Sequence, residues 1–150
     1  MPHHFLDSSA LLKRYRQGAG SQWMLDLPNR SDRLIVARLA HVEVTAALVR
    51  RGRQSGASAQ GTHSAPAALD SEMSGNLDVL EFSDQVITRA IDLAKSRALR
   101  AADAIQLASA LLARAALPAG TDFYLVSADD ELNAAASTER LQVENPNLYP

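Results

Sequence analysis

Short apolar runs alternate along the chain with longer stretches in which apolar residues recur every three or four positions. The runs predict buried strands and the longer stretches predict amphipathic helices. Strands are expected at 3–6, 34–37, 77–82, 123–126 and 141–143, and helices at 10–15, 39–50, 86–94, 101–116 and from about residue 129. The expected strands are apolar throughout, so neither of their faces can be exposed to solvent. Their alternation with helices indicates an α/β fold with a mostly parallel sheet covered on both sides.

Serine residues are expected to begin two of these helices, because a serine hydroxyl accepts from the free N–H groups of a first helical turn. Ser8 or Ser9 would cap the first helix, and Ser83 the helix over 86–94. Segment 52–75, rich in Gly, Ser, Ala and Gln with Pro66 in its middle, fits either a loose helical hairpin or a mobile excursion. With no internal repeat, one domain over 1–150 is expected.

The composition narrows the class of protein. Of 150 residues, 47% are apolar and 21% charged, which is typical of a globular domain. Because cysteine is absent, any bound metal must use oxygen or histidine ligands. No apolar stretch is long enough to cross a bilayer and the N-terminus does not resemble a secretory signal, so a cytoplasmic location is expected. The histidines lack zinc-type spacing and are interpreted as structural or exposed: His3, His4, His41 and His63.

Charge is distributed unevenly, although the net charge is only −2. Residues 1–75 hold nine Lys/Arg and six Asp/Glu, a balance of +3, and residues 76–150 hold six and eleven, a balance of −5. This asymmetry suits a basic flank beside an acidic centre. The densest basic group is Arg50, Arg51 and Arg53, which would either contact nucleic-acid phosphates or form a solvated helix C-terminus.

Acidic residues follow several of the expected strands. In an open parallel sheet, ligands bind outside the carboxyl ends of the strands. Asp7 directly follows the first strand, Glu43 lies in the helix after the second, and Asp129 lies three residues past Val126. Asp103 opens an otherwise apolar helix, where a buried carboxylate must be paired, protonated or metal-bound.

Each acid also has a plainer interpretation. Asp7 would serve as a helix cap or turn residue, and Glu43 as a solvated helix residue. Asp103 would complement a helix dipole, worth ~0.3–1 kcal/mol when exposed. Either Asp129 or Asp130 would merely cap the last helix.

If the four acids converge, their mutual repulsion raises their pKa values unless a cation lies among them. Carboxylate clusters suit Mg²⁺ or Mn²⁺, which keep several waters. A water bound to such an ion loses a proton more easily and can attack a phosphodiester. Hydrolysis of nucleic acid is therefore the chemistry that these residues suit.

Four segments also resemble, in order and spacing, the motifs of PIN-domain ribonucleases of the VapC type, the toxin half of bacterial VapBC toxin–antitoxin pairs. These segments are Phe5-Leu6-Asp7-Ser8-Ser9-Ala10-Leu11-Leu12-Lys13, Val42-Glu43-Val44-Thr45-Ala46-Ala47-Leu48, Arg100-Ala101-Ala102-Asp103-Ala104-Ile105-Gln106-Leu107-Ala108 and Val126-Ser127-Ala128-Asp129-Asp130-Glu131-Leu132. The terminal Asn145-Pro146 adds to the resemblance, whereas segment 52–75 matches least.

The resemblance implies a three-layer α/β/α fold, Mg²⁺- or Mn²⁺-dependent endoribonuclease activity, a homodimer, and inhibition by a VapB-like antitoxin. It implies that the four acids bind the metal directly or through a neighbour. Ser8 and Ser127 would support the site by their hydroxyls, and Ser127 stands where threonine is more usual.

Other functions fit less well. A phosphatase of the haloacid-dehalogenase type needs a second aspartate at position 9, which is serine here. A response-regulator receiver needs an acidic pair at the first strand end and an acceptor aspartate at the third, and neither can be placed. A catalytically silent PIN binding module would ordinarily have lost an acid, whereas an RNA-processing PIN nuclease stays an alternative to the toxin. The sequence specifies neither the RNA nor the antitoxin.

Overall fold

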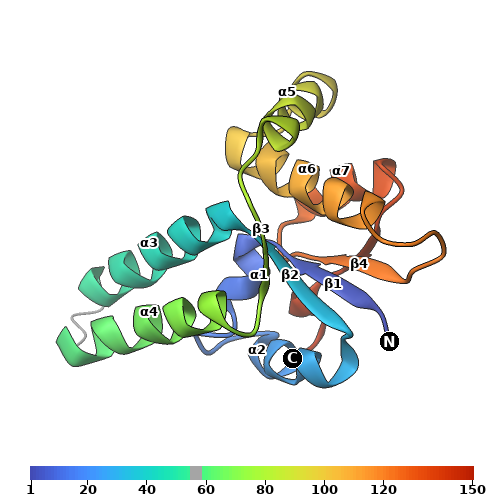
Figure 1. The fold of residues 1–150 in the computed structure, drawn as a ribbon. Coiled ribbons are helices and arrows are strands. Elements are labelled where there is room, and N and C mark those ends of the chain that lie inside the picture. The colour runs from blue at the N-terminus through green and yellow to red at the C-terminus, as the bar shows by residue number, and fades with distance from the viewer. Residues whose placement is uncertain (55–58) are drawn as a thin grey trace.

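Five parallel strands form one sheet in the computed structural model, which describes residues 1–54 and 59–150, and of residues 59–63 only the backbone (Figure 1). The strands are β1 (His3–Leu6), β2 (Arg33–Ala37), β3 (Asp78–Leu80), β4 (Phe123–Val126) and β5 (Gln142–Glu144), in the order β3-β2-β1-β4-β5. β1 lies at the centre, with Leu6 in register with Val36 and Val126. The predicted parallel α/β fold is confirmed.

Both faces of the sheet are covered. Phe5, Ile35 and Leu125 pack into one buried cluster with α5, α6 and α7. Leu6, Val36 and Val126, which come next along the same strands, pack into a second cluster with α1 to α4. The predicted three-layer α/β/α arrangement follows from this alternation. The helices are α1 (Ser8–Leu12), α2 (Ser21–Asp26), α3 (Arg38–Gln54), α4 (Ala59–Ser74), α5 (Asp84–Arg97), α6 (Ala101–Ala115), α7 (Asp130–Thr138) and the 3₁₀ turns η1 (Leu27–Arg30) and η2 (Pro146–Leu148).

The helix caps correct one prediction and confirm another. Asp7, and not Ser8 or Ser9, is the N-cap of α1, because its carboxylate accepts from the backbone N–H of Ala10 at 2.9 Å. Both serines already have helical backbone geometry, so their hydroxyls are free for other partners. Ser83 caps α5 as predicted, accepting from Val86.

The poorly legible segment 52–75 is largely helical where it is described. Gly52 belongs to the last turn of α3, α4 occupies 59–74, and residues 55–58 lie outside the described part. α3 and α4 lie side by side and extend together from one side of the sheet (Figure 1). α4 continues through Pro66, which lacks a backbone donor, and buries Leu69 and Met73 in the core.

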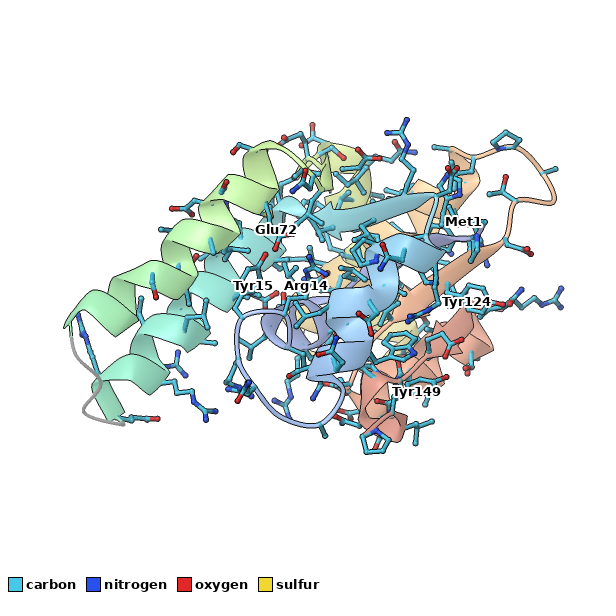
Figure 2. All side chains as sticks on the ribbon, turned by 90° about the horizontal axis from the view of Figure 1, so that it is seen from below. Met1, Arg14, Tyr15, Glu72, Tyr124 and Tyr149 are labelled. Carbon is cyan, nitrogen blue, oxygen red and sulfur yellow. The ribbon has the colours of Figure 1, made fainter. Side chains whose placement is uncertain are left out.

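A polar cluster joins the chain after α1 to α4, as Figure 2 shows. Arg14 donates to Glu72 at 2.8 Å and to the Met24 carbonyl at 2.8 Å, and the Tyr15 hydroxyl donates to the other oxygen of Glu72 at 2.6 Å. The Arg14 side chain is only 9% exposed, so this ion pair is largely removed from water. It anchors α4 on the domain.

The C-terminal segment packs against α2, which the sequence pattern did not predict. Gly20, at φ +81°, begins α2 so close to Pro146 that a Cβ there would lie 2.3 Å from the Pro146 carbonyl oxygen. Trp23 stacks on Tyr149 with ring centroids 4.7 Å apart. The terminal Asn-Pro motif therefore fixes the end of the chain beside the 127–130 loop, where Asn145 donates to Asp130 at 3.4 Å.

Histidine environments fit the predicted structural or exposed roles where they are described. His4 is buried, stacks on Tyr124, and shares a 2.7 Å hydrogen bond with Ser31. Burial, aided by the positive charge of Arg30, lowers the pKa of His4 to about 4, so it is neutral near pH 7. His41 pairs with Asp70 of α4, whereas the side chain of His63 lies outside the described part. No described helix is both long and apolar enough to cross a bilayer.

Candidate active site

Asp7 lies at the carboxyl end of the central strand β1 and is 4% exposed. One of its carboxylate oxygens accepts from the Ser9 hydroxyl at 2.7 Å and from the Ala10 N–H at 2.9 Å, and the other accepts from the Ser127 hydroxyl at 2.8 Å. Burial raises the pKa of Asp7 to about 6 although these hydrogen bonds lower it, and the negative charge of Asp129 adds to the rise. Asp7 is thus a helix cap and, at the same time, a buried carboxylate with excess negative charge around it.

Ser9 and Ser127 connect Asp7 to the loop after β4. The Ser9 hydroxyl accepts from the Ala128 N–H at 2.9 Å, and the Ser127 hydroxyl accepts from the Asp129 N–H at 3.0 Å. Ser127 is fully buried. The sequence predicted Ser127 as a supporting hydroxyl but gave Ser9 no role in the site, although its place two residues after Asp7 at a helix start was a usable signal.

Glu43, in the second turn of α3, is held by two donors on one oxygen. The Ser8 hydroxyl donates to its Oε1 at 2.6 Å, and the side-chain amide of Gln106 in α6 donates to the same oxygen at 3.0 Å. Gln106 also donates to the Ser8 oxygen at 2.8 Å. Sequence reasoning missed Gln106, which with Ser109 is one of two polar residues among the buried positions of α6.

Asp103 and Asp129 complete the predicted set of acids. Asp103 lies in the first turn of α6, half-buried, and burial raises its pKa, with the negative charge of Asp129 adding to the rise and Arg100 opposing it. Asp129 is the N-cap of α7, and its Oδ1 accepts from the Leu132 N–H at 3.0 Å. Asp130 is the first residue of α7 and is exposed.

Three of the four acids lie at helix N-termini. Asp7 and Asp129 are the N-caps of α1 and α7, and Asp103 lies in the first turn of α6. A helix N-terminus carries partial positive charge from its unpaired N–H groups and favours anions, typically by 0.3–1 kcal/mol on the surface. That contribution is too small to offset the burial of Asp7, whose pKa stays raised. The acids therefore form an electrostatically frustrated group that a cation would stabilise.

The acids do not form a closed cage. Among the described residues, no three acidic or histidine side chains are grouped closely enough to hold a metal by themselves. Glu43 has one oxygen engaged by two donors, and Asp129 has one engaged by a helix N–H. This donor set fits a hard, hydrated ion such as Mg²⁺, which typically takes one or two carboxylates and keeps several waters, better than an ion that needs a full set of protein ligands.

The arginines predicted as RNA contacts are separate from the acids. Arg50, Arg51 and Arg53 lie exposed in the last turns of α3. Arg50 follows Glu43 by seven residues, which places it on the same face of the helix about 10 Å further along the axis. Arg51 and Arg53 are rotated by about 80° to either side of that face.

A family model describing the PIN domain matches residues 4–137. The match covers most of the chain and spans all four acids, and the chain belongs to the PIN-domain family. The PIN-domain resemblance predicted from the four motifs is confirmed. No curated protein matches the chain in sequence.

Solved structures share the fold over nearly the whole chain. PAE2754 from Pyrobaculum aerophilum superposes with a TM-score of 0.69 at 20% identity, covering 98% of this chain and 91% of that one. A toxin–antitoxin complex from Klebsiella pneumoniae gives 0.66 at 15% identity, with 95% and 97% covered. VapC20 of Mycobacterium tuberculosis, described as a toxin that cleaves the sarcin-ricin loop, gives 0.66 at 15% identity, with 88% and 94% covered.

Proposed function

We propose that the protein is a Mg²⁺- or Mn²⁺-dependent endoribonuclease that acts as the toxin of a toxin–antitoxin pair. One observation carries the proposal: Asp7, almost fully buried, is braced by three donors and keeps a raised pKa beside Asp129. A protein gains nothing in stability from such an arrangement, because the buried charge costs more than its hydrogen bonds return. Arrangements of this kind are concentrated at functional sites.

Asp7, Glu43, Asp103 and Asp129 would surround the ion, which would bind one or two of them directly and the others through its waters. When bound, the ion would lower the pKa of a coordinated water and stabilise charge on the phosphate oxygens. The chain itself fixes the acids: Ser9 and Ser127 orient Asp7, and Ser8 orients Glu43. Preorganised groups of this kind avoid the cost of reorganisation during the reaction.

RNA would lie along α3, from the acids toward Arg50. The residues between Glu43 and Arg50 on this face include Ala46 and Ala47, which leave room for a ribose-phosphate backbone. Arg50 is exposed and would contact a phosphate some distance from the one that is cut. RNA as the substrate would also place the protein in the cytoplasm.

A VapB-like antitoxin would occupy the cavity between the chain after α1 and α4. This cavity measures about 380 Å³, and Leu25, 48% exposed, lines it together with Ala65 and Ala68. Lys13 and Arg16 line it too, and partial burial, with the positive charge of Arg16, lowers the pKa of Lys13. An apolar segment that carries acidic residues fits this mixture. A toxin–antitoxin complex among the solved structures of this fold supports such a partner.

A homodimer would cover two large apolar side chains near α3. Val42 is 68% exposed and Phe82 is 54% exposed. Arg38, one turn before Val42, pairs with Glu81 at 2.6 Å, which places the residue before Phe82 beside the start of α3. Phe82→Ser is expected to shift the protein to monomer in sedimentation equilibrium, whereas Leu148→Ser, at a still more exposed C-terminal leucine, would leave the distribution unchanged.

The proposal is tested by incubating purified protein with a panel of structured cellular RNAs and Mg²⁺ or Mn²⁺, with and without EDTA. Asp103→Asn should abolish cleavage, and Asp92→Asn, at an exposed acid of α5, should leave it intact. Cleavage that resists EDTA, or that Asp103→Asn retains, would contradict the assigned site. A folded, antitoxin-free protein that binds the RNAs but cuts none in either metal would indicate the silent binding module instead.

A further inference from the structure

Gln106 is buried in the middle of the domain although it makes no contribution to the apolar core. Gln106 is 2% exposed, and the other buried positions of α6 are almost all apolar. Its side-chain nitrogen has two partners, whereas its Oε1 is buried with no hydrogen-bond partner among the described residues. A buried carbonyl without a partner destabilises the fold, so an apolar side chain of the same shape would suit stability better.

We propose that Gln106 is a positioning residue that orients Glu43 for a metal ion, directly and through Ser8. The proposal rests on the function proposed above. Gln106 reaches from α6 to both partners, donating to Oε1 of Glu43 at 3.0 Å and to the Ser8 oxygen at 2.8 Å. Three elements separated in sequence, α1, α3 and α6, thus meet at one carboxylate.

The direction of donation is fixed by chemistry. An amide nitrogen only donates, so the Ser8 oxygen must accept from Gln106, and the hydroxyl proton is free to point to Glu43. That second bond is short, 2.6 Å, as expected for a hydroxyl donating to a charged carboxylate. The hydrogen bonds from Gln106 and Ser8 therefore hold the Glu43 carboxylate in one orientation.

Both donors meet the same oxygen. Oε1 of Glu43 accepts from Ser8 and from Gln106, and Oε2 accepts no hydrogen bond in the described part of the chain. One carboxylate oxygen is thereby held by the protein and the other is left for the ion. Asp103 lies one turn before Gln106 on the same face of α6, so a single turn supplies one acid and positions another.

The test begins with metal-free protein, because positioning does not depend on the ion. Carbon-13 relaxation of the Glu43 side chain is measured for the wild type, Gln106→Met and Gln106→Glu, neither of which can donate as the amide does. Mn²⁺ affinity is then measured by calorimetry for the same proteins. Ser109→Ala is the matched control, because Ser109 is equally buried one turn further along α6 and, within the described residues, its hydroxyl bonds only the Ile105 carbonyl.

The expected result is a more mobile Glu43 side chain in both Gln106 variants and Mn²⁺ affinity reduced by about 10- to 100-fold, with Ser109→Ala unchanged. Adding Ser8→Ala to Gln106→Met should weaken binding less than the two single effects combined, because both act on one carboxylate. An unchanged Glu43 side chain, or unchanged Mn²⁺ affinity, would overturn the positioning role. A mobile Glu43 in the variants, with a wild type that binds no Mn²⁺, would overturn the proposed function alone.

Discussion

The hydroxyl of Ser127 donates to the Oδ2 of Asp7 at 2.8 Å, across 120 positions of sequence and two neighbouring strands. The same hydroxyl accepts from the Asp129 N–H, so one buried side chain orients one candidate ligand and fixes the backbone of another. The loop after β4 and the end of β1 therefore form a single unit, which makes Ser127 a sensitive point in the site.

Removing the Ser127 hydroxyl should impair the site without unfolding the protein. Ser127→Ala is expected to reduce RNA cleavage by about 10- to 100-fold, because supporting partners of metal ligands typically contribute that much. Ser127→Thr keeps the hydroxyl and should retain most activity. Single-turnover cleavage rates compare the two, and equal losses in both variants would indicate a packing defect instead of a lost hydrogen bond.

Asp7 should destabilise the metal-free protein at neutral pH. Its pKa is about 6 in the folded state and 3.8 when unperturbed, so the folded protein binds more protons between those values, and stability falls as pH rises from about 4 to 6. A shift of about two pKa units corresponds to about 3 kcal/mol. Asp7→Asn should therefore be more stable than the wild type by up to that amount at pH 7.5, and nearly equal to it at pH 3.5.

Urea denaturation in EDTA at several pH values measures this difference. Asp92→Asn, at an exposed acid, is the control and should show no pH-dependent gain. A stability difference between Asp7→Asn and the wild type that stays flat from pH 3.5 to 7.5 would refute the assigned burial of charge.

The ion pair between Arg14 and Glu72 should matter more than an exposed pair of equal length. Arg14→Met leaves the carboxylate of Glu72 partly buried without its cation, and such losses typically cost about 3–5 kcal/mol. Arg33 pairs with Asp78 at 2.9 Å, nearly the 2.8 Å of the Arg14–Glu72 pair, but its side chain is 61% exposed. Arg33→Met should therefore cost less than about 1 kcal/mol. Chemical denaturation of both variants measures these losses in the free energy of unfolding. A loss for Arg33→Met equal to or larger than that for Arg14→Met would contradict the prediction.

Arg50 should contact the RNA backbone, and Arg53 should not. Arg50→Gln in an Asp103→Asn background is expected to weaken binding uniformly across RNA sequences and to reduce the salt dependence of log K by about one unit of slope. Arg53→Gln removes the same charge from a position turned away from the Glu43 face. Equal changes in both variants would mean that only net charge matters.

The strands and the acids could be predicted from the sequence because both depend on local features. A buried parallel strand is a short apolar run, and its carboxyl end is where a polar side chain becomes visible, as at Asp7 and Asp129. Asp103 was visible because it interrupts an apolar helix. Each of these signals lies within a few residues of its effect.

The parts that sequence reasoning missed depend on contacts between distant segments. Gln106 looks like an ordinary polar interruption until α6 is placed against Ser8 and Glu43. Ser8 and Ser9 were expected to compete for a cap that Asp7 provides, because cap choice depends on where the strand ends. α2 is six residues long, too short to show a helical period, and it depends on distant contacts: Gly20 lies against Pro146, and Trp23 of α2 stacks on Tyr149.

The most direct test of the central claim is the chemistry of the cut ends. If water attacks the phosphodiester at a metal-dependent acidic site, the reaction needs no 2′-hydroxyl, and the products carry no 2′,3′-cyclic phosphate. An RNA with a single 2′-deoxy substitution at the mapped cleavage site should be cut in Mg²⁺ or Mn²⁺ and spared in EDTA. Loss of cleavage at that linkage, with cyclic phosphate ends on the unmodified RNA, would show that the 2′-hydroxyl is the nucleophile and would contradict the account.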